Sequence, residues 1–261
     1  SQLIGKLAGI YNFSHQQIPA RRYWNLPIVN MVWNPNPRVP LPKYNLMCLT
    51  RYHAQRICDL TLQTVKYEDI CINTERYAFC PDKEDYFLFV GKLTPEKGAL
   101  EAVRICKELG VRLYVVGGLL PSDPKWYMWE VVRECDQKQI VFVGNASDDV
   151  KIKLMQKAKA LIYPVDFRHA FDMAHWQAGV EALSCGTPLI TYRLGCLKEV
   201  FEHGKHGFLV RDREEFKEAM QNIEDISPEE CRRYAWRYDR YRIVENYLRE
   251  VYKPVARGLR W

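Results

Sequence analysis

Two lysines lie in the stretch GKLTPEKG, residues 91–98, directly after the apolar run YFLFV at 86–90. Glycine lets a backbone approach a ligand closely, and proline suits the first turn of a helix, whose unpaired N–H groups favour an anion. Lys92 and Lys97 add two cations at the same place. The pattern predicts a loop that binds a diphosphate. The alternative is an ordinary strand-to-helix turn with two solvated lysines.

A carboxylate in an apolar setting is the second candidate. Residues 171–192 read FDMAHWQAGVEALSCGTPLITY, and we expect a helix there with Glu181 on its second turn. Its sequence neighbours are small or apolar, and a partly buried carboxylate needs hydrogen-bond donors, which the hydroxyls of a ligand could supply. The alternative is a glutamate on the surface of a helix.

Strands and helices alternate from residue 85 onward, so we expect a parallel, doubly wound α/β sheet. Such sheets bind ligands at the carboxyl ends of their strands, where the lysines of 91–98 lie. The predicted strands are 86–91, 112–118, 140–144, 160–165, 187–192 and 207–210. The predicted helices are 96–110, one within 125–136, 148–159 with Ser147 as N-cap, one around 175–185, 213–223 and 227–252.

The first 80 residues predict a smaller α/β domain. Apolar runs at 8–15, 26–34 and 43–50 are candidate strands, residues 51–63 a candidate helix and residues 69–79 a fifth element, with a proline-rich loop at 34–44. We place the linker near 80–85. The predicted domains are therefore residues 1–84, on the acceptor side, and residues 85–261, on the donor side.

The order of five motifs resembles the donor-binding half of retaining GT-B glycosyltransferases, family 4 in particular. These motifs are FVGKLTPEKG, VVGG, VFVGNASDDVKIKLMQKAKALIYP, EALSCGTPLITYRLGCLKEV and HGFLV, and the resemblance extends over about residues 85–253. It implies a GT-B-like fold of two Rossmann-like parallel-sheet domains, with the N-terminal one reduced here. It also implies transfer of a hexose from a nucleoside diphosphate sugar with retention of configuration, without a metal or a further cofactor.

The resemblance assigns roles to particular residues. Lys92 and Lys97 would contact the diphosphate of the donor, and Glu181 would hold the ribose hydroxyls; these three form the predicted catalytic set. The backbone of 142–145 would meet the nucleobase, and the start of the helix that carries Glu181 would present amides to phosphate or sugar. The predicted donor-binding residues are Gly91, Phe142, Val143, Gly144, Asn145, Trp176, Gln177 and Ala178.

Two features favour a different function. Met173 stands eight residues before Glu181, where the family has a first glutamate, and the N-terminal domain is short. The alternative is a nucleotide-sugar-binding module without transfer chemistry, or one subunit of a split glycosyltransferase. His15 is a candidate for the histidine that the family places near the sugar, although a lone histidine is more often structural. The short domain also predicts an oligomer that covers the edge of its sheet.

The positive charge is concentrated at the C-terminal end. The net charge is +6, and residues 232–261 carry nine Lys and Arg against three acids, interspersed with Trp and Tyr. This basic arm could bind an anionic membrane surface, which would suit a lipid-linked acceptor, or its aromatic residues could pack against the N-terminal domain. No nucleic-acid recognition motif accompanies the charge. The acceptor could be a sugar, a lipid-linked sugar or a protein glycan.

The nine cysteines show no C-x-x-C pair and no zinc-type spacing with histidine. We therefore expect reduced structural thiols and no metal site. No apolar stretch is close to the length of a membrane span, about 18 residues. The first residues lack the pattern of a secretory signal. The sequence predicts a cytoplasmic protein, with peripheral membrane contact through the basic arm as one of its two interpretations.

Overall fold

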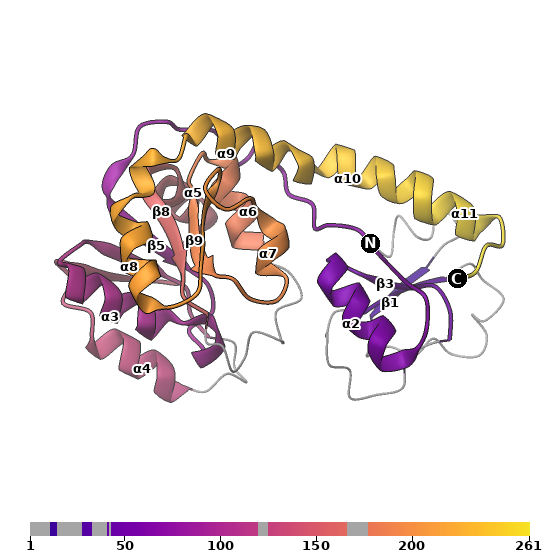
Figure 1. The fold of residues 1–261 in the computed structure, drawn as a ribbon, viewed down its shortest axis with the longest axis horizontal. Helices are drawn as coiled ribbons and strands as arrows, with labels where there is room; N and C mark the ends of the chain where they lie inside the picture. Colours follow the sequence, from indigo (N-terminus) through magenta and orange to yellow (C-terminus); the bar gives the residue numbers. More distant parts are fainter. Residues whose placement is uncertain (1–10, 15–27, 33–40, 42, 120–124, 166–176) are drawn as a thin grey trace. The chain divides into compact units, whose positions relative to one another are not determined.

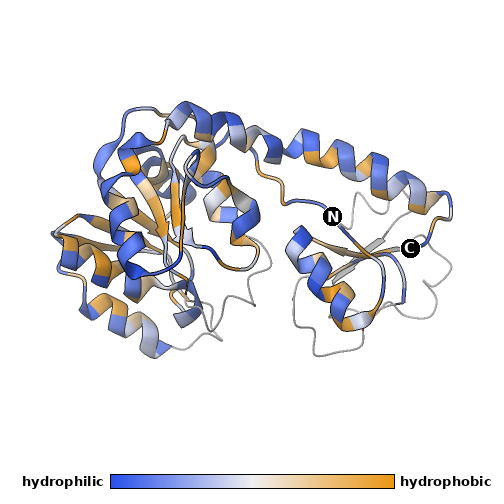
Figure 2. Ribbon diagram, in the orientation of Figure 1, coloured by the Kyte–Doolittle hydropathy of each residue, from blue (hydrophilic) through white to orange (hydrophobic). Residues whose placement is uncertain are grey.

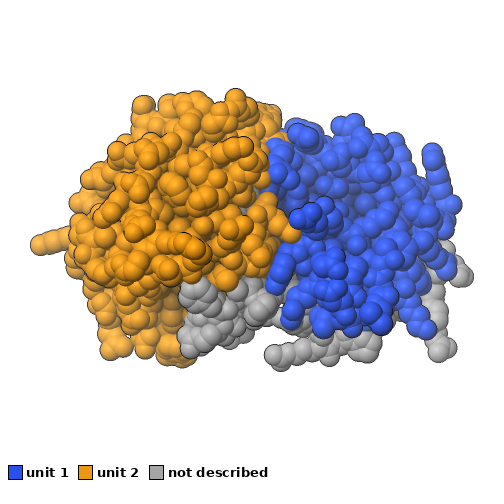
Figure 3. Space-filling view, in the orientation of Figure 1, with its two compact units in different colours: residues 1–71, 171–175, 237–261 blue, residues 72–170, 176–236 orange. Residues whose placement is uncertain are grey.

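The computed structural model describes residues 11–14, 28–32, 41, 43–119, 125–165 and 177–261. Contacts within the chain divide it into two units, coloured separately in Figure 3. The smaller unit comprises residues 1–71, 171–175 and 237–261, and the larger unit comprises residues 72–170 and 176–236. Each unit contains a parallel sheet of its own, as the sequence predicted.

The larger unit is built on six parallel strands in the order β10-β9-β8-β5-β6-β7. Figure 1 labels β5, β8 and β9 of this sheet. The chain runs outward from β5 to β6 and β7, and then returns to the other side of β5 to add β8, β9 and β10. The reversal between β5 and β8 is a topological switch point, where sheets of this kind bind ligands. The strands are β5 (Glu84–Val90), β6 (Leu113–Val116), β7 (Ile140–Gly144), β8 (Ala158–Tyr163), β9 (Leu189–Tyr192) and β10 (Gly207–Val210).

The central strands are apolar on both faces because helices cover a doubly wound sheet from both sides. Phe87, Leu88 and Phe89 are buried in succession on β5, and Leu161 and Ile162 are buried in succession on β8. Figure 2 shows the same concentration of hydrophobic residues in these strands. This continuity is why the six strands could be predicted from short apolar runs.

The helices follow the predicted order with two changes in continuity. Gly98, at φ +78°, separates a 3₁₀ turn from the helix predicted over 96–110. The helix predicted over 227–252 is interrupted after residue 235, and it resumes where the Asp239 side chain accepts from the Tyr241 N–H. The elements of the larger unit are η2 (Pro95–Lys97), α3 (Ala99–Leu109), α4 (Lys125–Arg133), α5 (Asp148–Lys157), α6 (Gln177–Ser184), α7 (Leu197–Val200), α8 (Arg213–Gln221), η4 (Ile223–Asp225) and α9 (Pro228–Ala235).

The smaller unit has four parallel strands in the order β1-β2-β3-β4 among its described residues. They are β1 (Tyr11–Ser14), β2 (Ile28–Met31), β3 (Leu46–Cys48) and β4 (Val65–Tyr67), and α2 (Arg51–Thr61) connects β3 to β4. β3 is shorter than the predicted run 43–50, while the predicted runs 8–15 and 26–34 extend beyond the described residues. The prediction of a fifth element at 69–79 is wrong. That segment is irregular and contains a turn in which the Arg76 N–H donates to the Asn73 carbonyl.

The C-terminal arm completes the core of the smaller unit. Val251, Tyr252 and Val255 pack with residues of β2 and β3, and the Trp261 indole N–H donates to the Leu46 carbonyl at 3.0 Å. The predicted packing of aromatic residues against the N-terminal domain is thereby confirmed for these positions. The arm consists of η5 (Trp236–Tyr238), α10 (Arg240–Tyr247), the π-helical turn η6 (Leu248–Tyr252) and α11 (Lys253–Ala256).

The boundaries of the two units differ from the predicted domain boundary between residues 84 and 85. Residues 72–84 group with the larger sheet, and residues 237–261 group with the smaller one. All nine cysteines are free. In the part of the chain that the structure describes, none of the helices has the length and apolar character needed to cross a membrane.

Candidate functional site

Hydrogen bonds join the loops at the carboxyl ends of three neighbouring strands. The Leu93 N–H, after β5, donates to the Gly118 carbonyl, after β6, at 2.9 Å. The Gly117 N–H donates to the Gly144 carbonyl at the end of β7, also at 2.9 Å. The predicted diphosphate loop, 91–98, and the predicted base segment, 142–145, therefore lie along one edge of the sheet.

Gly98 brings the diphosphate loop against the chain that leaves β8. A Cβ atom placed on Gly98 would lie 1.8 Å from the Pro164 carbonyl oxygen, and the backbone has the left-handed φ that glycine tolerates best. The loop is therefore packed directly over the switch point between β5 and β8. This contact gives a structural reason for the second glycine of GKLTPEKG.

The two lysines of the loop have different surroundings. Lys92 is exposed, whereas Lys97 ends the η2 turn and is half-buried. The Lys97 ammonium lies 5.9 Å from the centre of the Tyr163 ring, at the end of β8. Burial lowers the pKa of Lys97, and the neighbouring Glu96 partly offsets this effect. Lys97 thus presents its charge where solvent screens it less than it screens Lys92.

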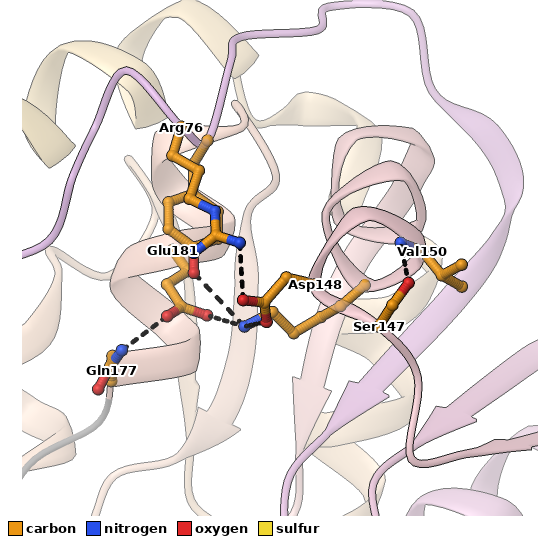
Figure 4. Close-up of polar contacts among 8 residues, drawn as sticks. Arg76, Ser147, Asp148, Val150, Gln177 and Glu181 are labelled. Carbon is orange, nitrogen blue, oxygen red and sulfur yellow. Dashed lines mark hydrogen bonds and ion pairs between the residues drawn. The ribbon is translucent and has the colours of Figure 1, made fainter.

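Glu181 is buried, with 3% of its surface exposed, so the interpretation as a surface glutamate is wrong. Its Oε1 accepts a hydrogen bond from Gln177 Nε2 at 2.8 Å, one turn earlier on α6. Its Oε2 lies 3.3 Å from Lys151 Nζ, which comes from α5. Figure 4 shows these contacts converging on the carboxylate. The partners that a buried carboxylate requires are supplied in part by the chain itself.

A second layer of charges holds the start of α5. Arg76 Nη2 lies 2.7 Å from Asp148 Oδ2, and Lys151 Nζ lies 3.5 Å from Asp148 Oδ1 (Figure 4). Ser147 caps the helix, since its hydroxyl accepts from the Val150 N–H, which confirms the predicted N-cap. These contacts fix the first turn of α5, which carries Lys151.

Tyr77, in the segment that precedes β5, is a further member of the cluster around Glu181 and Lys151. Lys151 Nζ donates to the Tyr77 hydroxyl at 3.4 Å. Burial, and then hydrogen bonding with the Glu181 carboxylate, raises the pKa of Tyr77. The guanidinium of Arg232, on α9, holds this segment, because its Nη1 lies 2.9 Å from the Tyr77 carbonyl and 2.7 Å from the Ser184 carbonyl on α6. Arg232 thereby ties the Tyr77 turn to the helix of Glu181.

The remaining predicted residues have these positions. Gly91 follows β5, Phe142, Val143 and Gly144 end β7 with partial exposure, and Asn145 is exposed beside Gly118. Gln177 and Ala178 begin α6, while Trp176, Met173 and His15 lie outside the described residues. Sequence reasoning missed Lys151, Tyr77 and Arg76. Their role depends on the register of α5 and on an irregular turn, and neither carries a motif.

Two further features concern ligands. In the described ranges, no group of three or more His, Cys, Asp or Glu side chains is arranged to hold a metal ion. A hollow of about 750 Å³ lies elsewhere on the larger unit and is lined by residues of α7, β10 and α8, including Lys198, Phe208 and Glu215. None of the predicted site residues lines it.

A comparison with protein-family models gives a match that includes the residues of this site. The family model for glycosyl transferases group 1 matches residues 75–238, which include the diphosphate loop, the base segment and the Glu181 cluster. The chain belongs to this family. The predicted resemblance to GT-B glycosyltransferases is thereby confirmed at the level of the family.

Curated relatives are similar to this chain over part of their length. A protein named "Probable sucrose-phosphate synthase" from Thermosipho melanesiensis is 27% identical over 196 residues, covering 67% of this chain and 44% of the relative. The O-antigen chain mannosyltransferase RfbU of Salmonella typhimurium is 28% identical over 189 residues, covering 69% and 51%. The chain thus spans about half the length of these curated relatives.

Solved structures show the same fold. AviGT4, a glycosyltransferase of avilamycin A biosynthesis, superposes with a TM-score of 0.76 at 21% identity, covering 97% of this chain and 75% of its own. Anabaena HepE in complex with UDP-glucose superposes with a TM-score of 0.70 at 16% identity, covering 87% and 72%. The predicted GT-B-like α/β fold with two parallel sheets is confirmed.

Proposed function

We propose that this glycosyl transferase moves a hexose from a nucleoside diphosphate sugar to an acceptor, with retention of configuration and without a metal ion. The observation that carries the proposal has two parts: hydrogen bonds join the lysine loop and the base segment along the carboxyl edge of one sheet, and the first turn of the next helix, α5, holds the buried Glu181 through Lys151. The complex of the structural neighbour HepE with UDP-glucose supports a nucleotide sugar as donor.

The leaving group is the nucleoside diphosphate, and negative charge grows on its oxygens as the bond to the sugar breaks. The ammonium groups of Lys92 and Lys97 would stabilise that charge. Lys97 would contribute more, because it is half-buried. Glu181 would accept from the ribose hydroxyls and hold the nucleotide in register. The backbone of 142–145 would meet the base, and the N–H groups of Gln177 and Ala178 at the start of α6 would face phosphate or sugar.

The first experiment is a calorimetric titration with UDP, GDP and ADP, then with the hexose conjugate of whichever diphosphate binds. We expect one diphosphate to bind and Lys97→Ala to remove most of that affinity. Incubation of the matching sugar nucleotide with sugar, lipid-linked and protein-glycan acceptors should then give a product whose anomeric configuration, read by NMR, equals that of the donor. A folded protein that binds none of the diphosphates would refute the proposal.

The alternative is a nucleotide-sugar-binding module that lacks transfer chemistry or needs a partner subunit. Met173 at the place of the family's first glutamate favours it. Tight binding of the sugar nucleotide, with neither transfer nor hydrolysis under any acceptor condition, is the result expected of such a module. Turnover that is lost in Lys97→Ala would exclude it.

A further inference from the structure

We propose that Lys151 is a positioning residue for donor binding: it holds one oxygen of Glu181 so that the other oxygen can accept from the ribose. This inference rests on the proposed function, because it concerns how Glu181 receives the nucleotide. It adds Lys151, on α5, to the residues proposed for donor binding in the lysine loop and around Glu181.

The first argument is charge. The Glu181 side chain is 4% exposed and the Lys151 side chain 20% exposed, with 3.3 Å between Oε2 and Nζ. An ionised carboxylate removed from water needs a cation or several hydrogen-bond donors to remain charged. Among the described residues, Lys151 is the cation that forms an ion pair with Glu181.

The second argument is geometry at the ammonium. Lysine has three N–H donors and no acceptor. Around Lys151 Nζ, Glu181 Oε2 lies at 3.3 Å, the Tyr77 hydroxyl at 3.4 Å and Asp148 Oδ1 at 3.5 Å. Three acceptors therefore surround three donors, and they come from α6, the turn before β5 and α5 itself. This arrangement holds the Lys151 ammonium beside the Glu181 carboxylate. We therefore assign Lys151 the role of positioning Glu181 and not that of contacting the diphosphate.

The third argument is the capacity of the carboxylate. Each oxygen of an ionised glutamate offers about two acceptor positions. The Glu181 Oε1 accepts from Gln177 Nε2 at 2.8 Å, and Gln177 is an exposed neutral side chain at the first residue of α6. A ribose hydroxyl can take the second position on Oε1 or replace the amide. Because Lys151 holds Oε2, the carboxylate keeps Oε1 turned toward the start of α6 while this exchange occurs.

The test compares a nucleoside diphosphate with its 2′,3′-dideoxy form, which lacks both ribose hydroxyls. The probes are UDP, GDP and ADP with their dideoxy forms, titrated by calorimetry. A hydrogen bond to a charged group corresponds to roughly 10- to 100-fold in affinity, so the wild type should prefer the ribose form by about tenfold or more. We expect Lys151→Met to bring this ratio close to one, with a smaller change in affinity for the dideoxy form.

Three further variants make the result specific. Lys153→Met removes the same charge from an exposed position on the same helix and should leave the ratio unchanged. Lys151→Arg keeps a cation and should restore part of the ratio. In a Glu181→Gln background, Lys151→Met should have no further effect on it. Thermal melts check folding, and Lys151→Gln, which keeps an N–H donor, replaces Lys151→Met if that variant does not fold.

The outcomes are distinguishable. If Lys151→Met weakens both forms equally or retains the wild-type ratio, Lys151 has only a structural role and the inference is wrong. If the wild type binds a diphosphate but shows no preference for the ribose form, the ribose role of Glu181 fails, and with it the inference, while the diphosphate loop stands. If the wild type binds no diphosphate, the proposed function itself fails.

Discussion

Lys97 and Lys92 are five residues apart, yet their charges act in different surroundings. Lys97 is half-buried beside Tyr163, whereas Lys92 is exposed. Coulomb interactions are stronger and less screened away from water. We therefore expect Lys97→Met to weaken diphosphate binding by about 30-fold, within the range of hydrogen bonds to charged groups, and Lys92→Met by about threefold, as for an exposed ion pair. Calorimetry at two salt concentrations checks this, and a larger loss from Lys92→Met would contradict it.

The lowered pKa of Lys97 predicts a pH dependence. Burial favours the neutral amine in the free protein, and a bound diphosphate favours the ammonium, so binding raises the pKa again. Above the lowered pKa, the protein must take up a proton to bind, and affinity falls as pH rises. Titrations at a series of pH values up to 10.5, each in two buffers of different ionisation enthalpy, should reveal this proton uptake. Lys97→Arg, which stays charged, should remove it; an unchanged uptake would assign it to another group.

Lys83 predicts a pH dependence of stability. Its ammonium donates to the Gln156 carbonyl at 2.9 Å and to Thr187 Oγ1 at 2.8 Å, and burial lowers its pKa from 10.5 to about 8. Between these values the unfolded chain binds more protons than the folded one, so the contribution of Lys83 to the free energy of unfolding rises with pH. Relative to Lys83→Met, the wild type should gain about 3 kcal/mol at most between pH 8 and 10.5.

Denaturant unfolding of both proteins across that range measures the difference. Because Lys83→Met lacks the titrating group, other alkaline titrations cancel in the comparison. A difference that is flat with pH would show that the acceptors around the ammonium, which include the Cys185 carbonyl at 3.3 Å, fully offset its desolvation.

Single residues could be predicted from sequence where residue type and local spacing sufficed. Lys92, Lys97 and Glu181 stood out because lysines at a strand end and a carboxylate among apolar residues are unusual. Lys151 did not stand out, since its contact with Glu181 depends on which turn of α5 faces α6. Tyr77 was assigned to a regular element, although the segment 69–79 is held by the guanidinium of Arg232 instead.

Among the elements, the loop between β5 and α3 has little freedom to change. The Gly98 Cα faces the Pro164 carbonyl so closely that an added Cβ would overlap it, and φ is +78°. Both effects oppose a side chain. We expect Gly98→Ala to lower the free energy of unfolding by about 2–4 kcal/mol and to weaken diphosphate binding by displacing Lys97. Gly110→Ala is the control.

Gly110 ends the same helix with a similar φ of +69°, but nothing lies within 4 Å of its added Cβ. The control therefore isolates backbone strain from the overlap with Pro164. Thermal unfolding and diphosphate titration of both variants give the comparison. Equal effects of the two substitutions on binding would argue against the packing of the loop over the switch point.

The boundaries of strands and helices depend on burial and on side-chain capping, and a sequence pattern shows these only in part. Buried parallel strands appear as apolar runs, so the six strands of the larger sheet were predictable. The break in the predicted helix 227–252 depends on Asp239, whose side chain caps a new helix, and an acid within a helical pattern is ordinarily read as solvated surface. In the smaller unit, β3 and β4 have three residues each, too few for alternation to locate their ends.

At the scale of the whole molecule, the parallel, doubly wound sheet of the larger unit was predictable from the alternation of strands and helices and the right-handed crossovers it implies. The place of residues 237–261 was not, because the sequence allowed both a membrane-binding arm and a packed one. The structure distinguishes two faces of this arm. Val251 is 3% exposed within the core of the smaller unit, and Val244, seven residues earlier, is 47% exposed.

These two valines provide a matched test of the arm. Val251→Asp places a carboxylate against Val29, Met47 and their neighbours, so the smaller unit should lose about 3 kcal/mol or more. Val244→Asp makes the same chemical change on an exposed surface and should cost less than about 0.5 kcal/mol.

Because the larger unit has its own sheet and core, Val251→Asp should selectively expose the smaller unit to protease. Limited proteolysis followed by mass spectrometry should then give early cleavage within residues 43–67 and a protected fragment that contains residues 72–236. Early cleavage throughout both units would mean that the arm stabilises the molecule as one cooperative body. Equal resistance of the two variants would mean that Val251 does not belong to the core of the smaller unit in solution.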